Sequence, residues 1–470
     1  MTFNSLTFLI FFAAVLALHR LPLPWRGRKT VLLVASYLFY AAWSPPFVAL
    51  LIVSTAVDWV AAARIHRAQG RARGAWLLLS LGVNLGLLSY FKYGPFLLEV
   101  THDLLASADI AFNPASDGIV LPMGISFYTF QTLSYTIDVY RGRLQPGRSL
   151  LDYALYVTFF PQLVAGPIVR AADFLPQCHE PKRAGAGQVG YGLILLTLGL
   201  LQKTVFADFL FAPVADRLFL QPAAAGSLGA WAGCLAFSGQ IFCDFAGYST
   251  CGIGVALCLG FALPDNFRAP YAAIGFSDFW RRWHISLSSW LRDYLYIPLG
   301  GNRGGSLRQA RNLLVTMLLG GLWHGAAWTF VAWGALHGVL LVIEHAAVAA
   351  FGSRAVWRRA GPQLGLAALT FLLITLAWVP FRATSFGDAG TVWAALIGGG
   401  PGDAPLHERT VPALVGIALL LLVQWRMRTT SLEALLATAP RWLVSVAIAG
   451  ALFLMAVAHE RTRGFLYFQF

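Results

Sequence analysis

The chain has 470 residues, of which 58% are hydrophobic and only 12% are charged. Soluble domains carry charges on roughly 25% of their residues, so this composition excludes an ordinary soluble domain. The net charge of +13 comes from arginines scattered through short loops, which is typical of membrane orientation and not of nucleic-acid binding. Apolar runs recur along the whole sequence, and they predict an all-α, polytopic transmembrane helical bundle.

The first apolar run, residues 3–18, has no basic segment before it and no small-residue cleavage site after it, so we expect a helix that is retained. Basic loops follow at 19–30 and 64–74, with two apolar helices and an uncharged Ser-Pro-Pro turn between them. Both basic loops therefore face the same side, which the positive-inside rule makes cytoplasmic. This orientation predicts that the N-terminus and the acidic segment at 103–117 lie on the outer side.

Many of the remaining apolar segments are shorter than the ~20 residues of a full crossing, and glycine or proline interrupts them. Broken backbone at membrane depth is tolerated where protein buries it or where it lines a wet cavity, so we expect re-entrant or broken helices around a central funnel. No soluble stretch could fold alone; the linker-like loop 398–409 is short, and residues 1–470 are expected to form a single integral membrane domain. The expected segments are 4–18, 31–43, 47–63, 75–93, 120–140, 150–166, 188–211, 228–246, 247–262, 311–323, 326–349, 364–380, 411–425 and 439–458.

The stretch 276–305, FSDFWRRWHISLSSWLRDYLYIPLGGNRGG, predicts an amphipathic helix that ends at Pro298 and the following glycines. Its aromatic residues fall on one side, as at a membrane interface. Two interpretations stay open: the arginines meet lipid phosphates, or the polar face lines an entrance for an anionic, phosphate-bearing ligand. On a helical wheel that polar face consists of Arg281, His284, Ser288 and Arg292.

His324 stands in the segment LGGLWHGAAW, where an ionisable ring is costly unless it faces a cavity or a partner. Low polarity favours the neutral imidazole, which is the form that a general base needs. His337 and His345 also lie in apolar sequence, and interhelical hydrogen bonds or helix packing would account for them. On one unbroken helix, His324 and His337 would be about 220° apart and would not share a site.

Acidic residues within apolar segments support a rival class, proton-coupled transporters, although no pattern repeats between the two halves of the chain. Structural roles are the simpler interpretation for Asp58, Asp138, Asp208, Asp244 and Glu344. The five cysteines form no CxxC pair, so we expect small buried side chains and neither a metal site nor a disulfide framework. No soluble nucleotide-binding or hydrolase motif is present.

Seven blocks of the sequence stand out, in chain order: LPMGISFYTFQTLSYTIDVYRG (121–142), FFPQLVAGPIVR (159–170), QIFCDFAGYSTCGIG (240–254), PDNFRAPY (264–271), FWRRWHISLSSWLRDYLYIPLGGNRGG (279–305), RNLLVTMLLGGLWHGAAWTFVAWGALHG (311–338) and FLYFQF (465–470). Taken together, these blocks resemble the membrane-bound O-acyltransferase superfamily, and most closely its bacterial branch typified by the alginate O-acetyltransferase membrane subunit. The resemblance spans most of the chain in the expected order.

The resemblance implies acyl transfer to a hydroxyl group, with His324 at the position of the family's intramembrane histidine and His284 at its second polar position. It implies a donor arriving from the cytoplasm, expected to be acetyl-coenzyme A as a co-substrate, with no tightly bound cofactor. It also implies the bacterial inner membrane and O-acetylation of an exported polysaccharide such as alginate. In that membrane, the outer side to which the basic loops assign the N-terminus is the periplasm. An extracytoplasmic acetyltransferase partner, a polysaccharide synthesis complex and the lipid bilayer are the expected partners.

With this resemblance, we expect His324 to act as general base on the acceptor hydroxyl and His284 to orient the acyl group or stabilise the oxyanion. Guanidinium groups suit the donor's phosphates. The residues expected to bind substrate are Arg281, Arg282, Ser288, Arg292, Arg303, Asn312 and Trp323.

Two departures from the branch pattern affect the acceptor. Ala246 and Thr250 stand where Ser and Asp are expected in this branch, so acceptor details would differ if that block touches substrate. A histidine at position 284 does not distinguish the alginate-type branch from the branch that transfers D-alanine to a cell-wall polymer. The GGNRGG and WHGAAW blocks favour the alginate-type branch. A transporter or channel, or a scaffold for a polysaccharide synthase, are the alternatives outside acyl transfer.

Overall fold

The computed structural model covers the whole chain and describes all residues except 113–117, 353–358, 401, 403, 459–463 and 467–470. The end of the acidic segment, two residues of the 398–409 loop and the last four residues of the FLYFQF block therefore lie outside the described residues. The described residues contain helices and no strands, which confirms the all-α prediction.

Contacts divide the chain into two compact units, residues 1–193 with 252–264 and residues 194–251 with 265–470. The first unit contains α1 (Leu6–Arg20), α2 (Trp25–Ala41), η1 (Pro45–Phe47), α3 (Val48–Arg67), α4 (Gly70–Leu88), η2 (Ser89–Tyr93), α5 (Gly94–Ala106), α6 (Ile125–Tyr140), α7 (Leu150–Thr158), α8 (Phe160–Leu163), α9 (Ala171–Phe174) and η3 (Leu175–Cys178). The boundaries between the units fall within α10 (Ala186–Leu201) and near the end of α12 (Ser227–Cys258).

The second unit adds η4 (Gln202–Phe211), α11 (Ala212–Leu220), η5 (Pro222–Ala224), η6 (Pro270–Ala272), α13 (Phe276–Trp280), α14 (Ile285–Leu291), η7 (Arg292–Tyr296), α15 (Ser306–His324), α16 (Trp328–Phe351), α17 (Ala360–Arg382), α18 (Phe386–Leu396), α19 (Thr410–Met427), α20 (Leu432–Thr438) and α21 (Arg441–Val457). Its core holds many large aromatic side chains, among them Trp283, Trp333 and Trp378, which are almost fully buried.

Seven helical stretches among the described residues are long and apolar enough to cross a membrane, so the chain is a multi-pass membrane protein. They are Pro45–Arg67, Gly70–Ala106, Ala186–Leu220, Ser227–Cys258, Trp328–Phe351, Ala360–Arg382 and Thr410–Met427. The prediction of separate segments at 228–246 and 247–262 is wrong, because α12 is continuous through Gly247. A side chain at Gly247 would lie 2.7 Å from the Gly199 carbonyl oxygen, so this glycine permits close packing of α12 on α10 and does not interrupt the helix.

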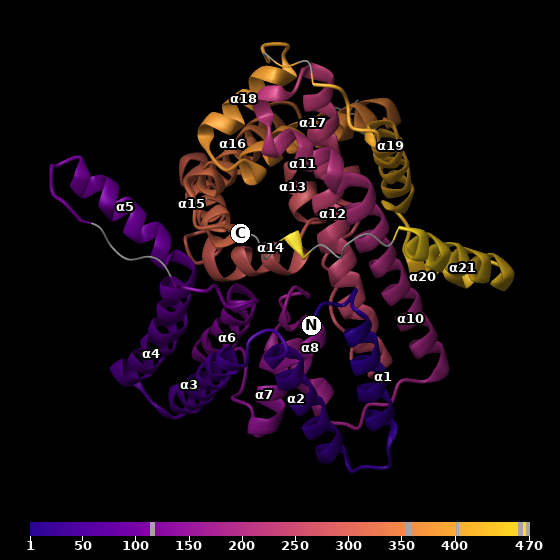
Figure 1. Cartoon of the computed structure of the whole chain (residues 1–470). Helices are drawn as coiled ribbons and strands as arrows, with labels where there is room; N and C mark the ends of the chain where they lie inside the picture. Colours follow the sequence, from indigo (N-terminus) through magenta and orange to yellow (C-terminus); the bar gives the residue numbers. More distant parts are fainter. Residues whose placement is uncertain (113–117, 353–358, 401, 403, 459–463, 467–470) are drawn as a thin grey trace. The chain divides into compact units, whose positions relative to one another are not determined.

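In the first unit, α3, α4 and α6 lie side by side (Figure 1). A buried polar cluster joins them: the Asp58 carboxylate accepts hydrogen bonds from Ser80 Oγ (2.6 Å) and Asn84 Nδ2 (2.9 Å), and Thr132 Oγ1 donates to Asn84 Oδ1 (3.2 Å). Unpaired polar groups are costly in hydrocarbon, so this cluster fixes the three helices together. The contacts agree with a structural role for Asp58.

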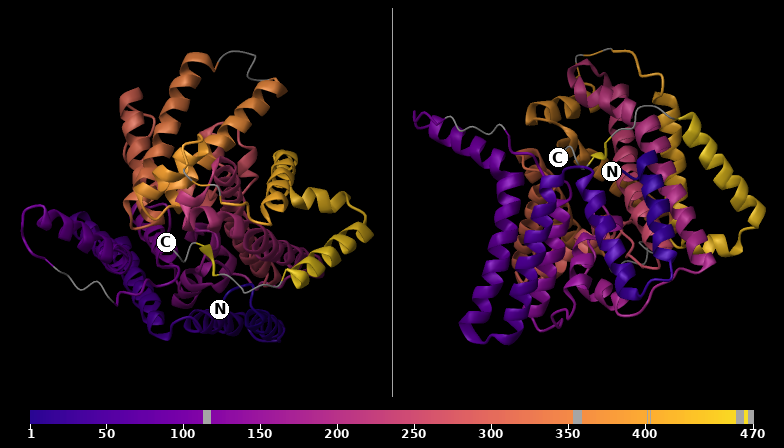
Figure 2. Two further views of the ribbon diagram at one scale, coloured as in Figure 1. Left: turned by 45° about the horizontal axis from the view of Figure 1, so that its top comes forward. Right: turned by 60° about the horizontal axis from the view of Figure 1, so that its bottom comes forward.

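In the second unit, α15 and α16 form the most extensive helix–helix contact, a hairpin joined by residues 325–327 and drawn in brown to orange shades in Figure 2. A Cβ atom at Gly334 would lie 2.3 Å from the Met317 carbonyl oxygen, and one at Gly321 would lie 2.2 Å from the Phe330 carbonyl oxygen. The backbones therefore meet without intervening side chains, as expected for small residues at a membrane helix interface. Gly321 and Gly334 therefore serve the packing of α15 on α16.

We expect Gly334→Ala to lower the free energy of unfolding by about 1–3 kcal/mol, because the added methyl group must push the α15 backbone away. Thermal unfolding of the detergent-solubilised protein would measure the change. The matched control is Gly365→Ala on α17, where a Cβ atom meets nothing within 4 Å. Equal melting temperatures for the two variants would contradict this account of the interface.

Candidate active site

His324 is the last residue of α15, and its side chain is only 3% exposed. Its ring centroid lies 5.0 Å from those of Trp323 and Trp333 and 5.5 Å from that of Phe381. Helices α15, α16 and α17 each supply part of this aromatic enclosure. The histidine is thus held in an apolar environment by three helices of the same unit.

The glycine after His324 explains why the helix ends there. Gly325 has extended backbone (φ −153°), and a Cβ atom at this position would lie 2.1 Å from the Phe330 ring. Only glycine lets the Phe330 ring pack against the turn. The WHG sequence therefore places the imidazole at a helix end that is covered by a ring from the next helix.

The chain from Phe276 to Tyr296 is not the single amphipathic helix that its periodicity predicts. Helix α13 ends at Trp280, and α14 begins only after His284, which adopts a left-handed conformation (φ 41°, ψ 56°). Left-handed backbone is strained for residues other than glycine and is tolerated best by short polar side chains. The break separates Arg281 and His284, so the polar stripe expected at helical spacing does not form.

The break turns His284 inward, where its side chain is fully buried. Its ring centroid lies 4.6 Å from that of Phe245, 5.9 Å from that of Trp323 and 6.4 Å from that of His324. The two histidines predicted as catalytic therefore lie together, in one unit and within one aromatic cluster.

The hydrogen bonding of His284 defines the form of its ring. The backbone N–H of Leu287 donates to Nδ1 at 3.3 Å, which caps α14 and requires that Nδ1 carries no proton. His284 lies outside the seven candidate spans, and burial lowers its pKa to about 3. At neutral pH the ring is therefore uncharged, with its proton on Nε2, and it can act as a hydrogen-bond donor through that atom.

Asn266 holds the start of α14 in place, although the sequence did not single it out. Its Oδ1 accepts from Ser286 Oγ at 2.9 Å, its backbone carbonyl accepts from the Ile285 N–H at 2.9 Å, and its Nδ2 donates to Ser249 Oγ at 3.0 Å. Asn266 is 1% exposed. The only sequence signal was its position in the PDNFRAPY block.

Of the seven residues predicted to bind substrate, Trp323 lies against both histidines, whereas the contacts of the others are local. Asp278 accepts from Arg282 Nε at 3.0 Å, and Asp293 accepts from Arg292 Nε at 2.8 Å. Arg281 is 72% exposed in its side chain, and Arg303 is also exposed.

Ser288 Oγ donates to the Trp283 carbonyl (3.1 Å), and Asn312 Nδ2 donates to the Gly301 carbonyl (3.0 Å), which anchors the GGNRGG turn. Their roles toward substrate stay predictions.

The residues 464–466 near the C-terminus are anchored beside this cluster by a buried lysine. Lys203 forms ion pairs with Asp208 and Asp244 and donates to the Gly464 carbonyl (3.2 Å), and Asp244 Oδ2 accepts from the Leu466 N–H (2.9 Å). Phe465, which is 1% exposed, packs on Phe245, the ring that touches His284. Two of the acidic residues that suggested a transporter, Asp208 and Asp244, thus pair with Lys203, and Asp244 also holds residue Leu466.

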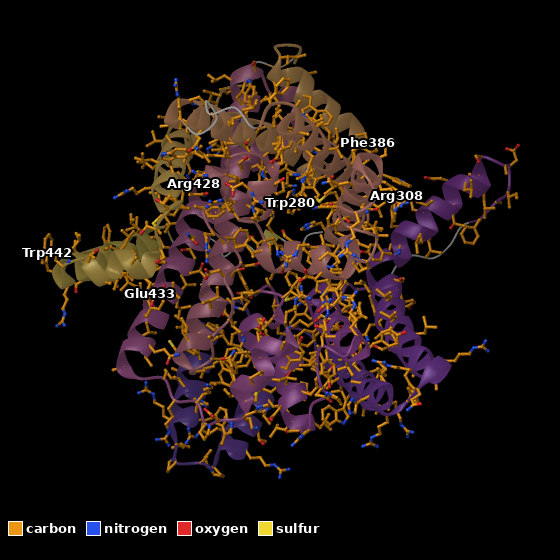
Figure 3. The ribbon with its side chains drawn as sticks, turned by 180° about the vertical axis from the view of Figure 1, so that it is seen from behind. Trp280, Arg308, Phe386, Arg428, Glu433 and Trp442 are labelled. Carbon is orange, nitrogen blue, oxygen red and sulfur yellow. The ribbon has the colours of Figure 1, made fainter. Side chains whose placement is uncertain are left out.

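His337 does not make the interhelical hydrogen bond expected for it. Among the described residues neither of its ring nitrogens has a hydrogen-bond partner, and the side chain is fully buried. Its ring instead packs 4.6 Å from Trp333 and 5.1 Å from Trp280, the latter labelled in Figure 3. The helix break at Gly325 brings His337 close to His324 through Trp333, so the separation expected for an unbroken helix does not apply.

Comparison with known proteins shows the family to which the chain belongs. Residues 144–379, half of the chain, match the model of the membrane-bound O-acyltransferase family. The chain belongs to this family. It is 42% identical over 428 residues to a Pseudomonas putida protein named "Probable alginate O-acetylase AlgI", covering 90% of this chain and 85% of that protein.

Two further relatives have related names. A Helicobacter pylori "Peptidoglycan O-acetyltransferase" is 37% identical over 79% of this chain and 74% of its own length. A Streptococcus thermophilus "Teichoic acid D-alanyltransferase" is 30% identical over 48% of this chain and 57% of its own length. This O-acyltransferase is therefore similar to O-acetylating enzymes over most of its length and to the D-alanylating one over only about half of it.

Proposed function

We propose that this acyltransferase moves an acetyl group from a cytoplasmic thioester, acetyl-coenzyme A, to a hydroxyl group for O-acetylation of an exported polysaccharide of the alginate type. The observation that carries the proposal is the pair of buried histidines, with ring centroids 6.4 Å apart, enclosed by aromatic side chains. The similarity to alginate O-acetylases supports the choice of substrates.

In the proposed reaction, His324 accepts the proton of the acceptor hydroxyl as its oxygen attacks the thioester carbonyl carbon. A C–O bond forms and, as the tetrahedral intermediate collapses, the C–S bond breaks. The departing thiolate takes the proton back from His324, so the ring returns to its starting form. A positioned base of this kind contributes typically ~10²–10⁴-fold in rate.

His284 suits a different task in the same step. Because Nδ1 accepts from the Leu287 N–H, the ring carries its proton on Nε2, and this N–H is the proposed donor to the oxygen that becomes negative during attack. A neutral imidazole whose pKa is lowered can serve in this way without giving up its proton. The two histidines thus divide base and donor roles between them.

The proposal also covers the residues that bind the acetyl donor, the side from which the acceptor arrives and the partner proteins. Four arginines with exposed or half-buried side chains would attract the donor's phosphates, because guanidinium geometry suits phosphate oxygens. These residues are Arg281, Arg282, Arg292 and Arg303. The acceptor would be reached from the periplasmic side, either directly or through an extracytoplasmic acetyltransferase in a polysaccharide synthesis complex. The proposed location is the bacterial inner membrane with the N-terminus outside.

Purified protein in sealed liposomes, supplied with acetyl-coenzyme A labelled in the acetyl group, tests the proposal. We expect release of free thiol and labelled ester on a uronic-acid polysaccharide when the polymer and the extracytoplasmic partner are present. Transfer of intact acetyl-coenzyme A across the liposome membrane, with no thiol release, would instead indicate a transporter. Release of thiol without dependence on His324 would contradict the assigned base.

A further inference from the structure

A basic pocket lies in the first unit, away in sequence from the histidines of the active site. The pocket has a volume of about 240 Å³, well above the roughly 10–15 Å³ that one water molecule needs on the same measure. We call it the His19 pocket. It is lined by Leu16, His19, Arg20, Arg183, Ala184 and Cys258.

Three segments that are distant in the chain build this pocket. His19 and Arg20 come from the last turn of α1, Cys258 from the end of α12, and Arg183 from the loop before α10. The loop packs tightly against the chain after α12, because a Cβ atom at Gly260 would lie 3.1 Å from Lys182 Cβ and 3.3 Å from the Ala184 N. The fold therefore brings Arg20 and Arg183 to the same pocket.

The pocket is strongly cationic. His19 is 3% exposed, and Arg28 and Arg183 are both near enough to act on its ring electrostatically. Among the described residues, Arg20, Arg28 and Arg183 form no salt bridge, whereas the nearby Lys29 is paired with Asp152. Uncompensated guanidinium groups around a cavity indicate a site for an anion, and their planar geometry suits phosphate oxygens.

The expected membrane orientation agrees with a phosphate ligand. The loop that contains Arg20 and Arg28 is one of the two basic loops that the positive-inside rule places in the cytoplasm, where the inner leaflet carries anionic lipid. Basic pockets between helices on that side are typical binding sites for acidic headgroups. Leu18, 46% exposed in the same turn of α1, offers an apolar surface beside the charges.

We propose that the His19 pocket binds a phosphate group, presented either by an anionic phospholipid headgroup or by a soluble phosphate compound. The guanidinium groups of Arg20 and Arg183, which line the pocket, contact the phosphate, and the nearby Arg28 adds positive charge. The pocket is separate from the residues assigned to acyl transfer, so the proposal stands whether or not the catalytic assignment holds.

Thermal unfolding of the purified full chain in neutral detergent, titrated with phosphatidylglycerol or with phosphatidylcholine, tests this site. We expect saturable stabilisation by phosphatidylglycerol alone. Arg20→Gln with Arg183→Gln should weaken its apparent affinity by roughly fivefold for each charge removed. Arg20→Lys with Arg183→Lys, which keeps both charges, should retain most of the affinity. The matched control is Arg67→Gln with Arg71→Gln, which removes two exposed arginines of the other basic loop.

The source of the phosphate is resolved by a second titration with coenzyme A and with inorganic phosphate. Stabilisation by either compound that depends on Arg20 and Arg183 assigns the pocket to soluble phosphates, and stabilisation by phosphatidylglycerol only assigns it to lipid. The proposal is overturned if the Arg20/Arg183 variant binds as well as the Arg67/Arg71 control, or if phosphatidylcholine stabilises the protein equally.

Discussion

The His324→Ala protein is expected to be produced, inserted and folded, yet to transfer acetyl groups at least ~10²–10⁴-fold more slowly than the unaltered enzyme. The ring lies at the end of α15 and packs among the rings of Trp323, Trp333 and Phe381. Removing it should therefore cost packing near the helix end but leave the fold intact. The chemical step, in contrast, would lose the group that accepts the acceptor's proton.

Transfer of labelled acetyl to polymer and release of free thiol measure this effect, and a melting temperature checks the fold. His324→Gln should behave in the same way, because an amide fills similar space but cannot accept the proton at neutral pH. The matched control is His345→Ala on α16: His345 is exposed, Nδ1 lies 2.7 Å from the Leu341 carbonyl, and its loss should leave transfer unchanged. A His324→Ala protein with the normal rate of transfer would remove the proposed base.

Much of the fold could be predicted from composition and hydropathy, because hydrocarbon permits few backbone arrangements other than helices. The positions where helices break were harder to predict. Gly247 was expected to interrupt a segment, but it lies within α12 as a packing contact, whereas Gly325 does end a helix. The difference lies in the neighbours of each glycine, the Gly199 backbone and the Phe330 ring, and neither is visible in local sequence.

In the candidate site, too, the contacts between residues distant in the chain could not be predicted from local sequence. His324 and His284 could be singled out, since a titratable ring in apolar sequence is costly and the WHG and WHISL blocks resemble a known family. Their closeness could not be derived, because helical periodicity assumed one helix through His284 and missed its left-handed conformation. Asn266 and Lys203 were not singled out as site residues, since their importance comes from partners distant in the chain.

The second large effect is expected at His284. The residue at this position must adopt a left-handed backbone conformation, and its side chain must donate a hydrogen bond. Asparagine tolerates left-handed backbone better than most residues, and its amide N–H₂ can donate in place of Nε2–H. Leucine meets neither demand. We therefore expect His284→Leu to lose ~10²–10³-fold in kcat, the typical cost of removing one oxyanion donor, and His284→Asn to keep a substantial part of the rate.

The pH dependence of the His284→Asn protein separates this donor role from an acid–base role. Because burial lowers the pKa of His284 to about 3, the ring is neutral in the folded protein throughout pH 5–8, and no proton is gained or lost there. Replacing it should therefore change the height of the pH–rate profile but not the position of its limbs in that range. A limb that moves or disappears in His284→Asn would mean that this histidine titrates during turnover, and the division of labour between the two histidines would have to be reversed.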